Sequence, residues 1–223
     1  MLTRNDLVAL VGRDRYVEEA ATARADAARP DYGRGGGAEL DVPHDLQEHI
    51  WWQPGSWHAK IALLFAVYDD MPAYGHLMYA KHHYEEFSTD DRAFWWNQVI
   101  ARVSGADPAL SQPLAYSLWC DFFEDPDTVA EAWATLTAPN VPVAVLKTAL
   151  RAAGPVPYAL KHPVYERLVI DPAWHEAILE SLLYSAYDYF GKVDVADARV
   201  LLDRLVLAPS LHDQVQALRA KLD

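Results

Sequence analysis

Apolar residues along this chain recur at helical spacing. In the stretch "HLMYAKHHYEEF", residues 76–87, Leu77, Ala80, Tyr84 and Phe87 fall three or four positions apart. Side chains at this spacing form an apolar stripe along one face of an α-helix. We predict that this stripe is buried against neighbouring helices. No segment combines sustained apolar and polar alternation with the turn dipeptides of hairpins. The sequence therefore predicts an all-α protein.

Helix starts are marked by a capping residue followed by proline, as in Asp107-Pro108, Asp125-Pro126 and Asp171-Pro172. The aspartate accepts from free N–H groups of the first turn, and proline fits the first helical position. Together with the apolar spacing, these marks predict an array of about 10–12 helices. The predicted ranges are 4–27, 43–52, 56–69, 72–87, 89–103, 108–123, 126–137, 142–153, 157–168, 172–190, 195–207 and 211–222.

One glycine-rich stretch interrupts this pattern. The residues "ARPDYGRGGGAEL", 28–40, are typical of a flexible connection. We therefore expect an N-terminal helix over 1–27, a flexible connection over 28–42, and a single all-α helical domain over 43–223.

Three stretches share a pattern of an apolar helix that ends in an aromatic residue and an acid. Aligned on Leu64, Trp119 and Leu183, they end in Tyr68-Asp69, Phe123-Glu124 and Tyr187-Asp188, with offsets of 55 and 64 residues. At the level of pattern, residues 56–222 resemble HEAT-like helical repeats, in which stacked helices form an α-solenoid. The alternative is an irregular, compact multi-helix bundle in which the similarity arises by chance.

The negative charge is concentrated in the middle of the chain. The net charge is −13, and residues 35–140 hold sixteen acidic and four basic side chains. Such a field repels phosphate backbones and anionic lipid and speeds encounter with a basic partner, although acidity also serves solubility. We expect a protein partner with a basic surface, no nucleic acid and no membrane. The acidic candidates for partner binding are Asp69, Asp70, Glu85, Glu86, Glu124, Asp125 and Asp127.

Histidines are also clustered, six of the nine lying between positions 44 and 83. His76 and His83 are seven residues apart, which is about 10.5 Å along a helix and too far to share one metal ion. Neither Glu-x-x-His nor His-Glu-x-x-His occurs. We therefore expect no metal and no cofactor, and we interpret the histidines as a surface or groove-edge cluster that titrates near neutral pH.

The segment "HDLQEHIWWQPGSWH", residues 44–58, alternates tryptophan and histidine around a Pro-Gly turn. Three tryptophans at one turn either plug the core or form one wall of a pocket, and we favour the plug. The pocket interpretation predicts an enzyme or a small-molecule-binding protein, with a site between residues 44 and 87. Its candidate residues are His49, Trp51, Trp52, Trp57, His58, His83 and Glu86.

A second, more limited resemblance concerns Trp95-Trp96-Asn97. HEAT-like alkylpurine DNA glycosylases carry a Trp-Trp-Asp stretch, which this segment resembles, but Asn97 stands where that chemistry needs an acid. The acidic surroundings also oppose DNA binding. A core-facing aromatic pair is the simpler interpretation of Trp95 and Trp96.

Other features favour the cytoplasm. The N-terminal segment is charged from Arg4 onward, unlike a signal peptide, and the longest apolar run, 61–68, is too short to span a bilayer. A single cysteine, Cys120, excludes an intramolecular disulfide. Our leading hypothesis is a cytoplasmic, helical-repeat-like protein that engages a basic protein through its acidic surface, as an inhibitor or immunity-type protein would. Whether it is also an enzyme is left open.

Overall fold

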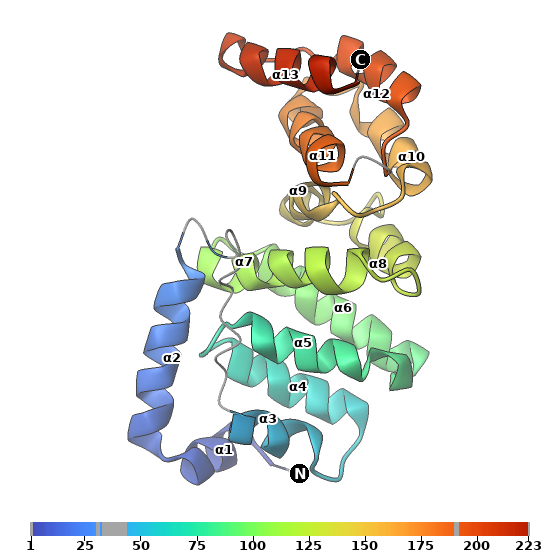
Figure 1. Cartoon of the computed structure of the whole chain (residues 1–223). Helices are drawn as coiled ribbons and strands as arrows, with labels where there is room; N and C mark the ends of the chain where they lie inside the picture. The colour runs from blue at the N-terminus through green and yellow to red at the C-terminus, as the bar shows by residue number, and fades with distance from the viewer. Residues whose placement is uncertain (1, 30–31, 33–43, 190–191, 223) are drawn as a thin grey trace. The chain divides into compact units, whose positions relative to one another are not determined.

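The computed structural model describes residues 2–29, 32, 44–189 and 192–222. Within these ranges the protein is all-α, with thirteen α-helices and no strand, as the sequence predicts (Figure 1). The helices form two compact units, unit 1 (Met1–Ser117) and unit 2 (Leu118–Asp223). Each unit has its own set of helix contacts.

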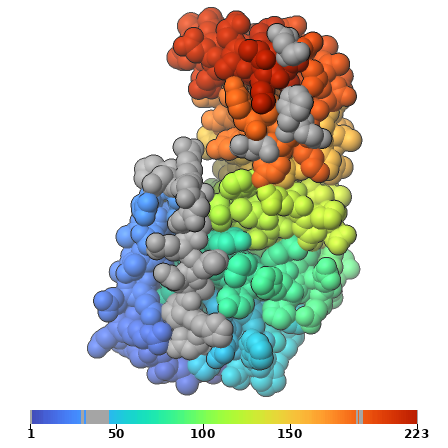
Figure 2. Space-filling view, in the orientation of Figure 1, coloured from blue at the N-terminus to red at the C-terminus, as the bar shows by residue number. Residues whose placement is uncertain are grey.

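Unit 1 contains α1 (Arg4–Val11), α2 (Arg13–Ala27), α3 (His44–Trp51), α4 (Trp57–Tyr68), α5 (Tyr74–His82), the 3₁₀ turn η1 (Tyr84–Glu86), α6 (Thr89–Val103) and α7 (Pro108–Ser117). Helices α4 and α5 lie side by side, α5 and α6 pack on α7, and α2 crosses to contact α7 (Figure 1). On the face in view, side chains fill the spaces between α4, α5 and α7 (Figure 2). Helices α1 and α3 pack on each other and on α4.

Unit 2 contains the π-helical segment η2 (Leu118–Phe123), α8 (Val129–Leu136), α9 (Val143–Ala152), α10 (Tyr158–Leu168), the 3₁₀ turn η3 (Pro172–Trp174), α11 (His175–Asp188), α12 (Val195–Arg204), the 3₁₀ turn η5 (Pro209–Leu211) and α13 (His212–Leu222). Helix α11 packs on α9 and α13, while α8 packs on α9 and η2. Helix α12 packs on α13.

Most predicted helices are found within a few residues of their expected ends, and the capping signals explain why. Helix α6 spans the predicted range, and Ser88 and Asp91 form the expected capping box at its start. The predicted helix over 4–27 is instead two helices, because Gly12 separates α1 from α2 with a φ of 92°. That backbone region is open to glycine and disfavoured for other residues. The predicted connection over 28–42 lies almost entirely outside the described residues.

The apolar stripe predicted over residues 76–87 is buried. Leu77, Ala80, Tyr84 and Phe87 are each at most 4% exposed. The stripe continues from α5 through η1, although the helix itself ends at His82. Its burial holds α5 in the core of unit 1.

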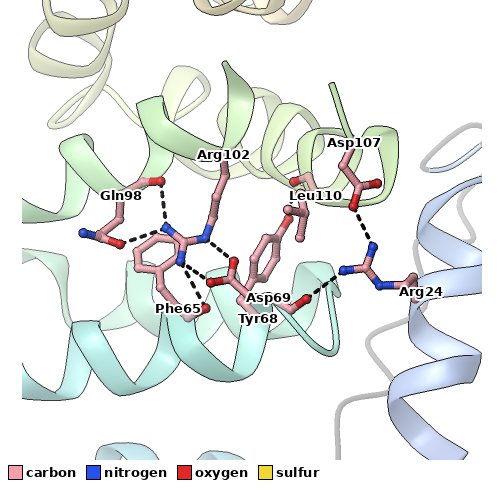
Figure 3. Close-up of polar contacts among 8 residues, drawn as sticks. All are labelled: Arg24, Phe65, Tyr68, Asp69, Gln98, Arg102, Asp107 and Leu110. Carbon is pink, nitrogen blue, oxygen red and sulfur yellow. Dashed lines mark hydrogen bonds and ion pairs between the residues drawn. The ribbon is translucent and has the colours of Figure 1, made fainter. Parts of the chain in front are cut away.

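A single arginine locks α6 to α4 (Figure 3). The Arg102 guanidinium donates to both carboxylate oxygens of Asp69, at 2.6 and 2.7 Å, and to the backbone oxygen of Phe65 at 3.2 Å. It also donates to the backbone and side-chain oxygens of Gln98, at 3.1 and 2.8 Å. Five N–H groups thus have five acceptors, so this arginine is fully satisfied.

Three further hydrogen bonds extend this junction to α2 and α7 (Figure 3). Arg24 on α2 donates to Asp107 at 2.6 Å and to the backbone oxygen of Asp69 at 2.8 Å. The buried Tyr68 hydroxyl donates to the backbone oxygen of Leu110 at 2.6 Å. The Arg24 guanidinium lowers the pKa of the Asp107 carboxyl. These bonds fix the C-terminal end of α4, and therefore its direction, within unit 1.

Candidate functional site: a tryptophan–histidine cluster

The first turn of α4 and the ends of α3 and α5 bring three aromatic rings together, which we call the Trp–His cluster: Trp51, Trp57 and His83. The His83 ring stacks on Trp51, with centroids 5.4 Å apart and 28° between the planes. It also lies 5.1 Å from the Trp57 ring at 32°. The two indole centroids are only 6.4 Å apart, so the three rings form a triangle in which each ring contacts the other two. The His83 side chain remains 30% exposed.

Two charged side chains complete the cluster. The Lys60 ammonium donates to the backbone oxygen of Trp51 at 2.6 Å and lies 4.6 Å from the Trp57 ring centroid. It thus binds a carbonyl at the C-terminal end of α3, where the helix dipole favours a cation. On the other side, Nδ1 of His83 lies 3.1 Å from a carboxylate oxygen of Glu86. Both contacts tie the edges of the cluster to neighbouring side chains.

A buried chain of hydrogen bonds sets the orientation of Trp51. Its indole Nε1–H donates to Oε1 of Gln47 at 2.9 Å, and the Gln47 amide nitrogen contacts Nδ1 of His76. Because Oε1 accepts from the indole, the amide donates to Nδ1, so His76 carries its proton on Nε2. That Nε2 atom is buried and has no hydrogen-bond partner among the described residues.

His76 does not belong to a surface histidine cluster, so that interpretation of the sequence was wrong for this residue. The side chain is fully buried, and burial lowers the pKa of His76 to about 3. Its imidazole stays neutral at physiological pH, which the Gln47 contact requires. His76 is therefore buried, whereas His83, seven residues later, is half-exposed.

The three tryptophans of the turn have different roles. Trp51 is 3% exposed and acts as the expected plug, and Trp57 is half-buried against Phe87, 5.5 Å between centroids. Trp52, in contrast, is 81% exposed. A large indole therefore lies in solvent one residue after a buried member of the cluster.

The two remaining pocket candidates, His58 and His49, are not part of the stacked rings. His58 is exposed and stacks on Phe94 of α6, with centroids 3.8 Å apart. His49 is half-buried on α3. Neither shares a ring contact or hydrogen bond that the structure describes with the Trp–His cluster.

The acidic candidates divide into paired and exposed carboxylates. Asp69 is held by Arg102, and Asp70 is held by Arg4 and by the Tyr16 hydroxyl at 2.9 Å. These carboxylates serve the contacts of α4 with α6, α1 and α2. Their charge is matched within unit 1.

In η1, Glu85 is exposed, and the exposed Glu86 carboxylate contacts Nδ1 of His83. In unit 2, Glu124 accepts a hydrogen bond from the Tyr189 hydroxyl. The Asp125 side chain caps the backbone N–H of Asp127 at 2.8 Å, and Asp127 is exposed. Of the seven carboxylates, Glu85 and Glu86 adjoin the Trp–His cluster.

The tryptophan pair at residues 95 and 96 and the possible metal ligands can also be located in the structure. Trp95 and Trp96 are buried, with Trp96 donating to the Tyr84 hydroxyl at 2.8 Å, while Asn97 is exposed. Across the described ranges, no three histidine, cysteine, aspartate or glutamate side chains lie so that they could hold a metal ion. No helix in those ranges is long and apolar enough to cross a membrane.

Comparison with known proteins adds no relative: no protein-family model, curated protein or solved structure matches this chain. The positions aligned for the repeat pattern, Leu64, Trp119 and Leu183, lie in α4, the π-helical η2 and α11. The resemblance to HEAT-like repeats therefore stays a prediction.

Three members of the site were missed from the sequence. Gln47 and Trp51 are four residues apart, which on a helix allows their side chains to bond, and this signal was available. Lys60 lies about one helical turn after Trp57, so the sequence also indicated that these two side chains could be in contact. The burial of His76 had no comparable signal, because its partner Gln47 is 29 residues away.

Proposed function

We propose that this chain is a cytoplasmic helical protein that binds a basic protein segment on unit 1, at a docking surface formed by Trp52, His83, Glu85 and Glu86. The observation that carries the proposal is the 81% exposure of Trp52, the residue that follows the buried Trp51 of the Trp–His cluster. Exposed tryptophans on rigid supports are frequent energetic centres of protein interfaces. Burying such a ring against a partner removes apolar surface from water.

The support under Trp52 is rigid, which favours binding. The preceding residue, Trp51, is buried, bonded to Gln47 and stacked on His83. The backbone oxygen of Trp51 is held by Lys60. Little conformational freedom remains to be lost at this end of α3 when a partner binds.

The charge of the docking surface indicates the chemistry of the partner. Glu85 and Glu86 are exposed on η1, and the middle of the chain is strongly acidic. A partner with lysine or arginine around an apolar contact would complement both features, with arginine also able to stack on the exposed indole. A small-molecule pocket at the same place has less support, because the plug residue Trp51 is fully engaged.

The first test is the binding of a fluorescently labelled amphipathic peptide that carries arginines on one face. Trp52→Ala should weaken its affinity by at least about tenfold, the loss typical of an interface centre. The matched control is Ile170→Ala in unit 2, because Ile170 is also 81% exposed. Equal affinities for the two variants would remove the basis for placing the surface at Trp52.

A charge-matched pair of double variants separates docking from general attraction of cations. Glu85→Gln with Glu86→Gln removes two charges at the surface, and Glu176→Gln with Asp213→Asn removes two exposed charges in unit 2. The first pair should reduce peptide affinity and its salt dependence more than the second. Equal reductions would mean that net charge alone attracts the peptide.

A further inference from the structure

Unit 2 contains a lysine that is removed from water. Lys161 on α10 is 0% exposed. Its Nζ donates to the Ser185 hydroxyl at 2.6 Å, to the backbone oxygen of Ala153 at 3.2 Å and, more weakly, to that of Gly154 at 3.5 Å. A charged lysine is rarely buried unless it is paired, so this position needs an explanation.

The groups around the amine are hydroxyls and carbonyls. The Ser185 hydroxyl donates to the backbone oxygen of Ser181 at 2.8 Å, and the Ser181 hydroxyl lies 2.7 Å from the Tyr165 hydroxyl. The two carbonyls lie just beyond the last residue of α9, where the helix dipole is negative. None of the hydrogen bonds described for Nζ involves a carboxylate.

This arrangement accommodates the lysine in either protonation state. The ammonium has three N–H donors, and three oxygens surround it. If it loses a proton, two N–H groups can keep the two carbonyls, and the Ser185 hydroxyl can rotate to donate to the nitrogen lone pair. Because hydroxyls both donate and accept, neither state leaves the amine or Ser185 without a partner.

We propose that the Lys161–Ser185 pair is a proton-operated device in the core of unit 2, which makes that unit more stable as the pH rises from neutral. The partners that the structure describes for the amine are neutral dipoles, and the site is closed to water. Release of the proton removes the cost of burying that charge, and the Ser185 hydroxyl exchanges its bond to the Ser181 carbonyl for one to Nζ. The device works without a ligand.

The titratable groups near Lys161 support this direction. Burial, with a further contribution from Lys192, lowers the pKa of Lys161 to about 7 from an ordinary value of 10.5. On the same helix, burial raises the pKa values of Tyr165 and Tyr158, so both stay neutral in this range. Beyond α11, Tyr189 packs over Gly154, and burial together with Glu124 raises its pKa as well.

The sign of the effect follows from these values. Between pH 7 and 10.5 the unfolded chain holds a proton on Lys161 that the folded chain has released. Stability rises with pH wherever the unfolded state binds more protons. The unfolding equilibrium constant should therefore fall about 50-fold between pH 7 and pH 9 from this residue alone.

The test is chemical unfolding of the full chain at several pH values from 6 to 9, followed by amide exchange to separate unit 2 from unit 1. Lys161→Met keeps an apolar chain of similar length, and in this variant the unfolding equilibrium constant should no longer fall between pH 7 and pH 9. In Lys147→Met, a substitution at an exposed position, the equilibrium constant should fall as it does in the wild type. Parallel profiles for wild type and Lys161→Met would overturn the proposal.

If Lys161→Met does not fold, NMR of the six lysine side chains of the wild type decides, since one should titrate near pH 7. Titration of all six above pH 9 would overturn it equally.

Discussion

The His83 ring stacks on the Trp51 ring, with centroids 5.4 Å apart and 28° between the planes. This contact joins the end of α3 to the residue that follows α5. It makes Trp51 part of the interior of unit 1, although the next residue, Trp52, is largely in solvent. Two neighbouring tryptophans therefore differ in what they contribute, the first to folding and the second to the proposed docking surface.

Truncating these neighbours should separate the two contributions. Trp51→Ala removes a buried ring and its hydrogen bond to Gln47, so it should lower the free energy of unfolding by about 3 to 5 kcal/mol. Trp52→Ala should change it by no more than about 0.5 kcal/mol, as is usual for surface substitutions. Urea unfolding measures both. A large loss for Trp52→Ala would mean that its ring is part of the fold.

The junction of Figure 3 gives a second prediction for unit 1. Arg102 is 12% exposed at its side chain, and Arg102→Ala leaves the Asp69 carboxylate without its two guanidinium donors, while the Phe65 carbonyl keeps the backbone N–H of Asp69 at 3.0 Å. We expect a loss of about 2 to 3 kcal/mol. The control is Arg151→Ala, which breaks an exposed pair with Glu180 and should cost at most about 1 kcal/mol. Equal losses would show that the junction adds nothing beyond an ordinary surface pair.

The buried His76 should make the protein sensitive to acid. Its pKa is about 3 in the folded state and near 6.5 when unfolded, so below pH 6.5 the unfolded chain binds the extra proton. Stability is lost as the pH falls, by about 2 kcal/mol between pH 7.5 and pH 5 from this residue. Comparing wild type with His76→Leu isolates the effect from the carboxylates, and His82→Leu at an exposed position is the control. A pH profile unchanged by His76→Leu would contradict the assignment.

A close approach in unit 2 can be tested by adding one methyl group. A Cβ on Gly154 would lie 2.8 Å from the ring of Tyr189, so Gly154→Ala should cost about 1 to 3 kcal/mol through overpacking. In the Tyr189→Ala background the same substitution should cost much less, because the obstructing ring is gone. Thermal unfolding of the four proteins gives this coupling. If the stability losses of Gly154→Ala and Tyr189→Ala simply add in the double variant, the Tyr189 ring is not what obstructs the added methyl group.

Much of the fold could be predicted because its signals are local. Ser88 and Asp91 sit three residues apart and mark the start of α6, and the stripe from Leu77 to Phe87 identifies the buried face of α5 and η1. The break at Gly12 was harder to foresee, since a single glycine inside a helical pattern is often tolerated.

The candidate site could be predicted only in part. Trp51, Trp57 and His83 were all singled out from the sequence, but which of the three tryptophans would be exposed was not determined by spacing. That depends on where α3 ends relative to Gln47 and His76, a contact between residues 29 positions apart. The pairing of Asp69 with Arg102 is similarly distant, so the sequence alone left that carboxylate as a partner-binding candidate.

The most direct test of the proposed docking surface is NMR of the isotope-labelled full chain during titration with the arginine-bearing amphipathic peptide. The account predicts that chemical-shift changes concentrate on the Trp52 indole N–H and on backbone amides of residues 48–60 and 83–87, and that they saturate at one peptide per chain. Changes spread over the exposed carboxylates of both units, or centred in unit 2 with the Trp52 indole unaffected, would contradict it.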